Sequence, residues 1–246
     1  RRHVETGLCN PVFIEGDSTW TIEERMKHYG VHGVSIAVID DFRIAWTKSY
    51  GVMDTTSKRP VTDSTLFQAA SISKPVFTMA ALKLVEQGAI KLDEDVNAQL
   101  TSWKMPENEF TAKEKVTLKR LLGHVAGTTV HGFQGYQKGE PTPTLLNILN
   151  GEAPSNSPAV VVDQVPGTAW RYSGGGYCVA SQLILDAKGG TIPQHMHDLV
   201  LQPVGMSHST YEQPPPEAMA HSASSGYVND GSLVNGNWHV YPELSP

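Results

Sequence analysis

A helix spanning Ala70 to Gly88 is the strongest structural signal in the sequence, because a segment of this length must bury one face against a core. Its apolar residues recur at helical spacing, at Met79, Leu82 and Val85. Gly88 is typical of the residue just beyond a helix end. Pro75 falls in the first turn, where its missing N–H group costs no hydrogen bond. The pattern therefore predicts that Ser71 lies at or next to the helix start.

The helix start carries a serine and a lysine three residues apart, in Ser71-Ile-Ser-Lys74. Residues at this spacing share a helix face, with Cβ atoms about 5–6 Å apart. A serine becomes a good nucleophile when a neighbour takes its proton, and a lysine does so when burial or a cation destabilises its ammonium. Taken alone, the pair is expected about once by chance in a chain of this length. A helix cap beside a solvated lysine is then the simpler interpretation.

Before this helix, the sequence predicts a β-hairpin with one buried face. Residues 33–40 are apolar and β-branched, Asp40-Asp41 suits a tight turn, and residues 42–48 alternate apolar and polar side chains. A short helix is expected at 23–28. After it, the pattern indicates short helices and loops, with helices at 116–122, 145–150, 176–187 and 192–201. The dipeptides near Asp230 and Asn235 predict a last hairpin within 227–241.

Composition excludes several classes of function. The chain of 246 residues has a net charge of −6, which implies no nucleic-acid surface, and no apolar run approaches the roughly 20 residues of a membrane span. Cys9 and Cys178 are too far apart for a metal motif, and either one disulfide or two free thiols is compatible with them. His195 and His197 are two apart on a predicted helix and make a poor metal pair. We therefore expect neither a metal nor an organic cofactor.

Five segments, in chain order, resemble one known family. They are Thr65-Leu-Phe-Gln-Ala-Ala-Ser-Ile-Ser-Lys74, Gly88-Ala-Ile-Lys-Leu-Asp-Glu-Asp-Val96, Val116-Thr-Leu-Lys-Arg-Leu-Leu-Gly-His-Val-Ala-Gly127, Pro166-Gly-Thr-Ala-Trp-Arg-Tyr-Ser-Gly174 and Leu201-Gln-Pro-Val-Gly-Met206. The sequence is similar to the serine β-lactamases and penicillin-binding proteins, of the class C type that includes related carboxylesterases and D-alanyl peptidases. In the third segment, Gly123 and Ala126 stand where the family usually has serines.

The resemblance implies an α+β fold, with an antiparallel sheet flanked by helices and a helical lobe, as in the β-lactamases and transpeptidases. Residues 1–70 would form the N-terminal part of the α/β lobe, with the hairpin at 33–50. Residues 71–202 would form the nucleophile helix and the helical lobe, and residues 203–246 would return to the α/β lobe.

The resemblance also assigns roles to residues. Ser71 would be the covalent nucleophile and a backbone oxyanion donor, with Lys74 and Tyr172 as its proton-transfer partners. The resemblance also makes His124, Trp170 and Gly174 candidate substrate-binding residues.

Gly174 replaces an Asn that in the family usually contacts the amide of the substrate. The replacement favours simple ester hydrolysis over β-lactam or peptide recognition. We therefore expect a serine hydrolase of carboxylesterase type that acts on a small ester, amide or β-lactam. The alternatives are a β-lactamase or D-alanyl-D-alanine carboxypeptidase, and a non-catalytic binding or sensor domain on the same fold. A periplasmic or secreted location is favoured over a cytoplasmic one.

Two other catalytic motifs fit poorly. The glycines at 174–176 lack the spacing of a phosphate loop and indicate a flexible turn at the start of the helix, and Arg171 precludes a nucleophile elbow at Ser173. The family's third motif, Lys-Thr-Gly or His-x-Gly on a strand, has no counterpart after Tyr172, since Lys188-Gly-Gly190 ends a predicted helix. We therefore expect the sheet to lack its C-terminal strands in this chain and to be completed by a further segment or a second polypeptide.

Overall fold

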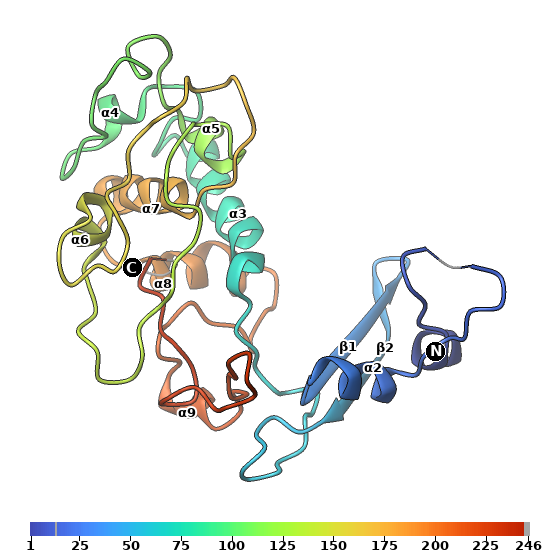
Figure 1. The fold of residues 1–246 in the computed structure, drawn as a ribbon. Helices are drawn as coiled ribbons and strands as arrows, with labels where there is room; N and C mark the ends of the chain where they lie inside the picture. Colours follow the sequence, from blue (N-terminus) through green and yellow to red (C-terminus); the bar gives the residue numbers. More distant parts are fainter. Residues whose placement is uncertain (13, 244–246) are drawn as a thin grey trace. The chain divides into compact units, whose positions relative to one another are not determined.

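The computed structural model describes residues 1–12 and 14–243, and the chain forms two compact units (Figure 1). One unit comprises residues 1–68 and 218–238, and the other comprises residues 69–217 and the segment from His239 on. The predicted boundaries after residues 70 and 202 stay predictions.

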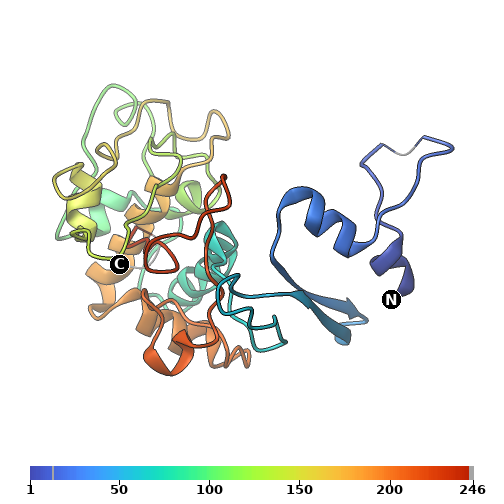
Figure 2. The same cartoon turned by 60° about the horizontal axis from the view of Figure 1, so that its bottom comes forward.

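The first unit contains the predicted hairpin. Strand β1 (Gly33–Asp40) pairs antiparallel with β2 (Arg43–Gly51), and the two form a two-stranded sheet among the described residues (Figure 2). On one face the paired residues Val34 and Tyr50, and Val38 and Trp46, are buried or half-buried, as the alternating pattern predicts. Further strands that would complete this sheet stay a prediction.

The hairpin turn lies one residue later than predicted. Asp40 is the last residue of β1, and the turn consists of Asp41 and Phe42, with φ of 47° and 59°. A tight two-residue turn that matches strand twist requires positive φ at both central residues, and an aspartate tolerates that conformation better than most residues. The turn therefore places the Phe42 side chain in solvent.

Helices α1 (Arg2–Thr6) and α2 (Ile22–Tyr29) precede the hairpin in the chain. Helix α2 confirms the predicted helix at 23–28 and extends it by one residue at each end. A capping box fixes its start, because Thr21 accepts from the Glu24 N–H and the Glu24 carboxylate accepts from the Thr21 N–H. Gly30, with φ of 65°, ends it in the left-handed conformation.

The second unit is helical, and α7 is its central element. Helix α7 contacts α3, α4, α5, α6 and α8, and its first residues, Gly174 to Ile184, are all buried. The bounds are α3 (Ser73–Glu86), α4 (Val96–Gln99), α5 (Leu118–Leu122), α6 (Leu145–Asn150), α7 (Gly174–Lys188) and α8 (Ile192–Met196). The short helix α9 (Glu217–Ala220) lies almost wholly in the part of the chain that returns to the first unit.

Four predicted elements differ from the structure. Helix α5 begins at Leu118 rather than 116, because Thr117 caps it by accepting from the Arg120 N–H at 3.3 Å. Helix α7 begins at Gly174 rather than 176, because Ser173 caps it by accepting from the Gly176 N–H at 2.9 Å. The helix predicted at 192–201 changes after Met196 into a wider π-helical turn, His197–Leu201. The last predicted hairpin, at 227–241, is formed only in part: a turn after Val228 brings Tyr227 and Leu233 into one antiparallel bridge, but these residues form no extended strand.

Both cysteines are free in the described part of the chain, with Cys9 exposed and Cys178 buried. Burial raises the pKa of the Cys178 thiol, so this sulfur stays protonated and behaves as a small apolar group. No helix within residues 1–12 and 14–243 has the length and apolar character that crossing a membrane requires.

Glu243 leads to a prediction about stability. Its side chain is 1% exposed, and burial raises the pKa of its carboxyl from 4.5 to about 7. Between these two pH values the folded state holds a proton that the unfolded state has released, so stability falls as pH rises through this window. Glu243→Gln is expected to remove that loss, which is at most about 3 kcal/mol. Urea unfolding at pH 4.5 and pH 7.5 measures it; an unchanged pH dependence in the variant would contradict the assignment.

Candidate active site

Three side chains meet at the start of α3. Lys74 Nζ donates to Ser71 Oγ at 3.2 Å, and Tyr172 Oη donates to the same oxygen at 2.6 Å. Tyr172 comes from the loop before α7, about one hundred positions along the chain, so the fold itself brings the two motifs together. The structure thus places the three predicted catalytic residues in one hydrogen-bonded group.

Ser71 lies in a tight 3-10 turn, η1 (Ala70–Ile72), which leads directly into α3. Ala70 has a φ of 44°, a left-handed conformation that costs a residue with a Cβ atom about 1–2 kcal/mol. Such strain persists when the surrounding structure holds it, and here it turns the chain just before the serine. The serine side chain itself is exposed, as a nucleophile that must reach a substrate requires.

Lys74 is buried to 7% exposure in the first turn of α3. Its Nζ lies 5.1 Å from the centre of the Tyr172 ring and 5.5 Å from that of the Tyr177 ring. Tyr177, on α7, donates its hydroxyl to the Leu122 carbonyl oxygen at 3.1 Å, which holds its ring in place. The ammonium therefore sits between two aromatic rings, which stabilise a cation through their π faces.

The loop that carries Tyr172 is held on both sides by backbone contacts. The Arg171 N–H donates to the His124 carbonyl oxygen at 2.8 Å, and His131 Nδ1 bonds the Tyr172 carbonyl oxygen at 2.6 Å. The Arg171 guanidinium donates to the Gly127 carbonyl oxygen at 2.9 Å and forms an ion pair with Asp163. These contacts together fix the position of the Tyr172 backbone.

Opposing influences set the pKa of Tyr172. Burial raises it, but the hydrogen bonds with Lys74 and Ser71, together with the positive charge of Lys74, outweigh burial and hold the pKa below its ordinary value of 10.0. A lowered pKa increases the fraction of phenolate, the form that can accept a proton, at a given pH.

The three predicted substrate-binding residues lie around this group. The His124 ring is 4.4 Å from the Tyr172 ring, and the Trp170 ring is 6.2 Å from the His124 ring. Trp170 is 68% exposed, so its indole is accessible to a molecule in solution. Gly174 is buried at the first residue of α7. The structure brings His124 and Trp170 to the site, and Gly174 follows Tyr172 by two residues with its backbone against Phe133.

The glycines at the start of α7 are a packing requirement, which corrects their interpretation as a flexible turn. A Cβ atom on Gly174 would lie 2.7 Å from the Phe133 ring, and one on Gly175 would lie 2.8 Å from the Thr129 carbonyl oxygen. The segment 128–133 therefore packs directly against the helix backbone, and the Gly175 N–H donates to the Val130 carbonyl oxygen at 3.0 Å. Only glycine permits this approach.

Sequence reasoning missed three residues that shape the site. Tyr177 faces Lys74, Phe133 contacts the backbone at Gly174, and Tyr211 donates its hydroxyl to the Ser73 carbonyl oxygen at 2.6 Å. The position of Tyr177, one helical turn after the start of α7, is a signal that could have identified it. Phe133 and Tyr211 lie in irregular segments whose positions no local pattern predicts.

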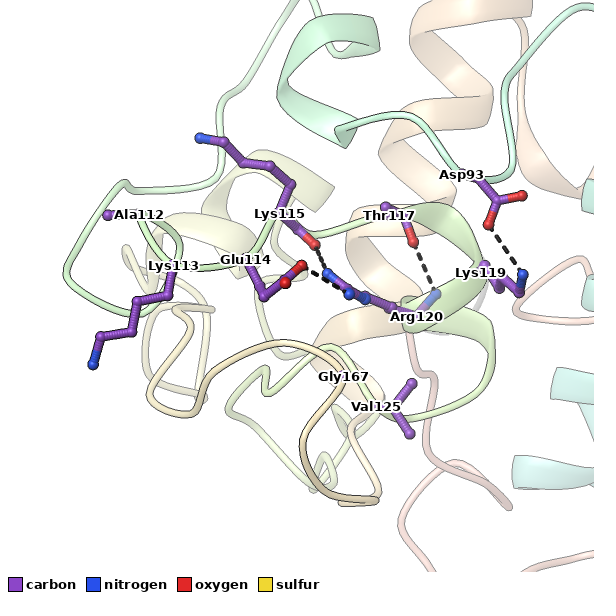
Figure 3. Close-up of a pocket in the computed structure, with 10 residues that line it drawn as sticks. All are labelled: Asp93, Ala112, Lys113, Glu114, Lys115, Thr117, Lys119, Arg120, Val125 and Gly167. Atoms are coloured by element: carbon purple, nitrogen blue, oxygen red, sulfur yellow. Dashed lines mark hydrogen bonds and ion pairs between the residues drawn. The ribbon is translucent and has the colours of Figure 1, made fainter.

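A pocket of about 640 Å³ lies elsewhere in the helical unit, and none of the three central residues lines it (Figure 3). Its walls carry Lys119 and Arg120, but these are paired with Asp93 at 3.1 Å and Glu114 at 3.0 Å. These two cations are therefore satisfied by carboxylates of the pocket itself. Among residues 1–12 and 14–243, no group of histidine, cysteine and acidic side chains could hold a metal ion.

A helical unit with a serine, a lysine and a tyrosine in mutual contact is typical of a class of serine hydrolases. Residues 20–243 match the family model described as Beta-lactamase, and the chain belongs to that family, whose members are serine hydrolases.

Curated relatives and a solved structure agree with this family. The chain is 26% identical over 252 residues to "Unguisins hydrolase ungD" of Aspergillus violaceofuscus, covering 94% of this chain and 42% of that protein. It is 27% identical over 207 residues to "Esterase EstB" of Burkholderia gladioli, covering 80% of this chain and 52% of that protein. The octameric penicillin-binding protein homologue from Pyrococcus abyssi has a similar fold, with a TM-score of 0.66, 22% identity and coverage of 90% and 50%. The chain thus spans about half the length of these relatives.

Proposed function

We propose that this protein is a carboxylesterase-type serine hydrolase, which transfers the acyl group of a small ester to water through Ser71. The observation that carries the proposal is the convergence of Lys74 Nζ and Tyr172 Oη on the Ser71 hydroxyl, at 3.2 and 2.6 Å. In the resting group both neighbours donate to Oγ, so one of them must lose its proton before it can accept one. The lowered pKa of Tyr172 favours the phenol for that role.

The proposed reaction has two stages. Ser71 Oγ attacks the ester carbonyl carbon while its proton passes to the Tyr172 phenolate, with the Lys74 ammonium stabilising that phenolate beforehand. The tetrahedral oxyanion is stabilised by the Ser71 N–H at the helix start. The leaving alkoxide departs with the proton from Tyr172, and the acyl group remains on Ser71. Water then attacks the acyl-enzyme, gives its proton to Tyr172, and the acid is released as Ser71 regains its proton.

Gly174 and Phe133 support an ester rather than an amide substrate. The asparagine that the family usually has at this position would not fit at 174 without displacing Phe133. Even its Cβ atom would lie 2.7 Å from the Phe133 ring. No side chain is then present at this position to bond a substrate amide. The relative named as an esterase agrees with this preference.

The test is a steady-state comparison of substrates. We expect repeated turnover of a short-chain nitrophenyl ester and much slower hydrolysis of a chromogenic cephalosporin. The double variant Phe133→Ala/Gly174→Asn has space for the amide and should raise the ratio of cephalosporin to ester hydrolysis, with Phe133→Ala alone as its matched control. Faster hydrolysis of the cephalosporin by the unaltered protein would indicate a β-lactamase instead. A single acylation without turnover would indicate a binding or sensor domain.

A further inference from the structure

His124 contacts the Tyr172 loop through three different groups. Its carbonyl oxygen accepts from the Arg171 N–H at 2.8 Å, its Nδ1 accepts from the Ser173 N–H at 3.2 Å, and its ring lies 4.4 Å from the Tyr172 ring. The residues immediately before and after Tyr172 are therefore both bonded to one histidine. His124 itself has a φ of 57°, a strained conformation that lets its backbone and its side chain reach the same loop.

We propose that His124 is the positioning residue for Tyr172, and that it performs this role only as a neutral imidazole with the proton on Nε2. This inference rests on the proposed hydrolase function. The tautomer follows from the contact, because a backbone N–H always donates and Nδ1 must then carry a lone pair. Its ring packs on the Tyr172 ring and fixes the direction in which the phenol points toward Ser71.

His131 provides an internal comparison. Its Nδ1 meets the Tyr172 carbonyl oxygen at 2.6 Å, and a carbonyl oxygen only accepts, so this nitrogen must carry a proton. The two histidines therefore bond neighbouring peptide groups in different ways: Nδ1 of His124 is unprotonated and accepts, whereas Nδ1 of His131 is protonated and donates. Protonation leaves the His131 contact intact, whereas protonation of His124 turns its acceptor into a donor that faces the Ser173 N–H.

The surroundings of His124 favour its neutral form. The ionisable groups that face it are Lys74 from α3, Tyr177 from α7 at a ring distance of 5.3 Å, and Tyr172 itself. Arg171, the next cation along the loop, is paired with Asp163. Burial, and then the positive charge of Lys74, lower the pKa of His124 below its ordinary value of 6.5. As pH falls through that lowered value, a second cation would form near Lys74 and the contact with Ser173 would break.

The experiment compares two substitutions with the unaltered protein. His124→Phe keeps an aromatic ring and removes the acceptor, and His124→Asn keeps an acceptor that does not titrate. For the nitrophenyl ester we expect His124→Phe to lower kcat by roughly 10²-fold with little change in KM, since a misdirected catalytic group costs about that much. His124→Asn should have a kcat much closer to that of the unaltered protein. In this variant kcat/KM should no longer show the fall at low pH that protonation of His124 causes. The exposed His208 is the matched control, and His208→Phe should change neither quantity.

Nitrogen-15 NMR of the imidazoles tests the tautomer without any substrate. A resonance of His124 with unprotonated Nδ1, titrating below pH 6.5, is expected. A protonated Nδ1 at neutral pH, or unchanged kcat and pH profile in His124→Phe, would overturn the proposal. If no ester is turned over, the proposed function fails. The inference about His124 is then still decided by its tautomer and by the pKa of the Tyr172 phenol measured in His124→Phe. If that variant does not fold, the NMR result and the His124→Asn profile decide it.

Discussion

Ser71→Ala is expected to abolish covalent labelling by a fluorophosphonate probe and to lower kcat for the nitrophenyl ester by roughly 10⁴–10⁶-fold. The substitution removes the oxygen on which Lys74 and Tyr172 converge, and no acyl-enzyme can then form. Mass spectrometry of the peptide containing Ser71 should show one added phosphonyl group in the unaltered protein and none in the variant. Stability should change little, because the serine side chain is exposed.

Ser73→Ala is the matched control for this experiment. Ser73 lies in the same four-residue motif, but neither Lys74 nor Tyr172 bonds to its side chain in the described structure. Its substitution should leave the labelling intact and change kcat by less than about tenfold. Labelling that persists in Ser71→Ala, or that moves to another serine, would remove Ser71 from the proposed mechanism.

Local signals were sufficient to predict the elements that carry the nucleophile. Helix α3 begins after Ser71 and ends before Gly88, as its apolar spacing, the proline in its first turn and the glycine beyond its end indicate. Helix α6 occupies the predicted residues 145–150, because Thr144 forms a capping box with Asn147 and Gly151 ends it at a φ of 67°. Such signals depend only on neighbours in the chain and can be seen without knowledge of the fold.

The surroundings of Tyr172 depend on contacts that no local pattern contains. His124 and His131 reach its loop from about 40 to 50 positions away in the chain, and the sequence indicated for His124 only a substrate-binding role. The glycines at the start of α7 looked flexible because the sequence does not show that segment 128–133 packs against them. In the tail, the turn signal near Asp230 correctly predicts the turn between Tyr227 and Leu233, but a local turn signal does not determine how far the flanking strands pair.

Lys74→Ala and Tyr172→Phe are each expected to lower kcat by roughly 10²–10⁴-fold, the usual contribution of a general acid or base, with a smaller change in KM. Tyr172→Phe keeps the ring against His124 and removes only the hydroxyl that bonds Ser71. Lys74→Ala removes the buried cation. Tyr29→Phe is the matched control, because it deletes an exposed hydroxyl on α2 that bonds Arg25 and not Ser71. A loss of only a few-fold in either variant, with the fold intact, would exclude that residue from proton transfer.

The pH profile separates the two roles. If the Tyr172 phenolate accepts the serine proton, kcat/KM rises with pH and levels off above the pKa of Tyr172, which lies below 10.0 in the folded protein. Lys74→Ala removes the hydrogen bond and the positive charge of Lys74, which both lower that pKa, so the rise should move to higher pH while keeping its shape. Tyr172→Phe should lose this rise altogether. A profile that stays in place in Lys74→Ala and persists in Tyr172→Phe would instead make another group the base, and the tyrosine would then serve only to orient the serine.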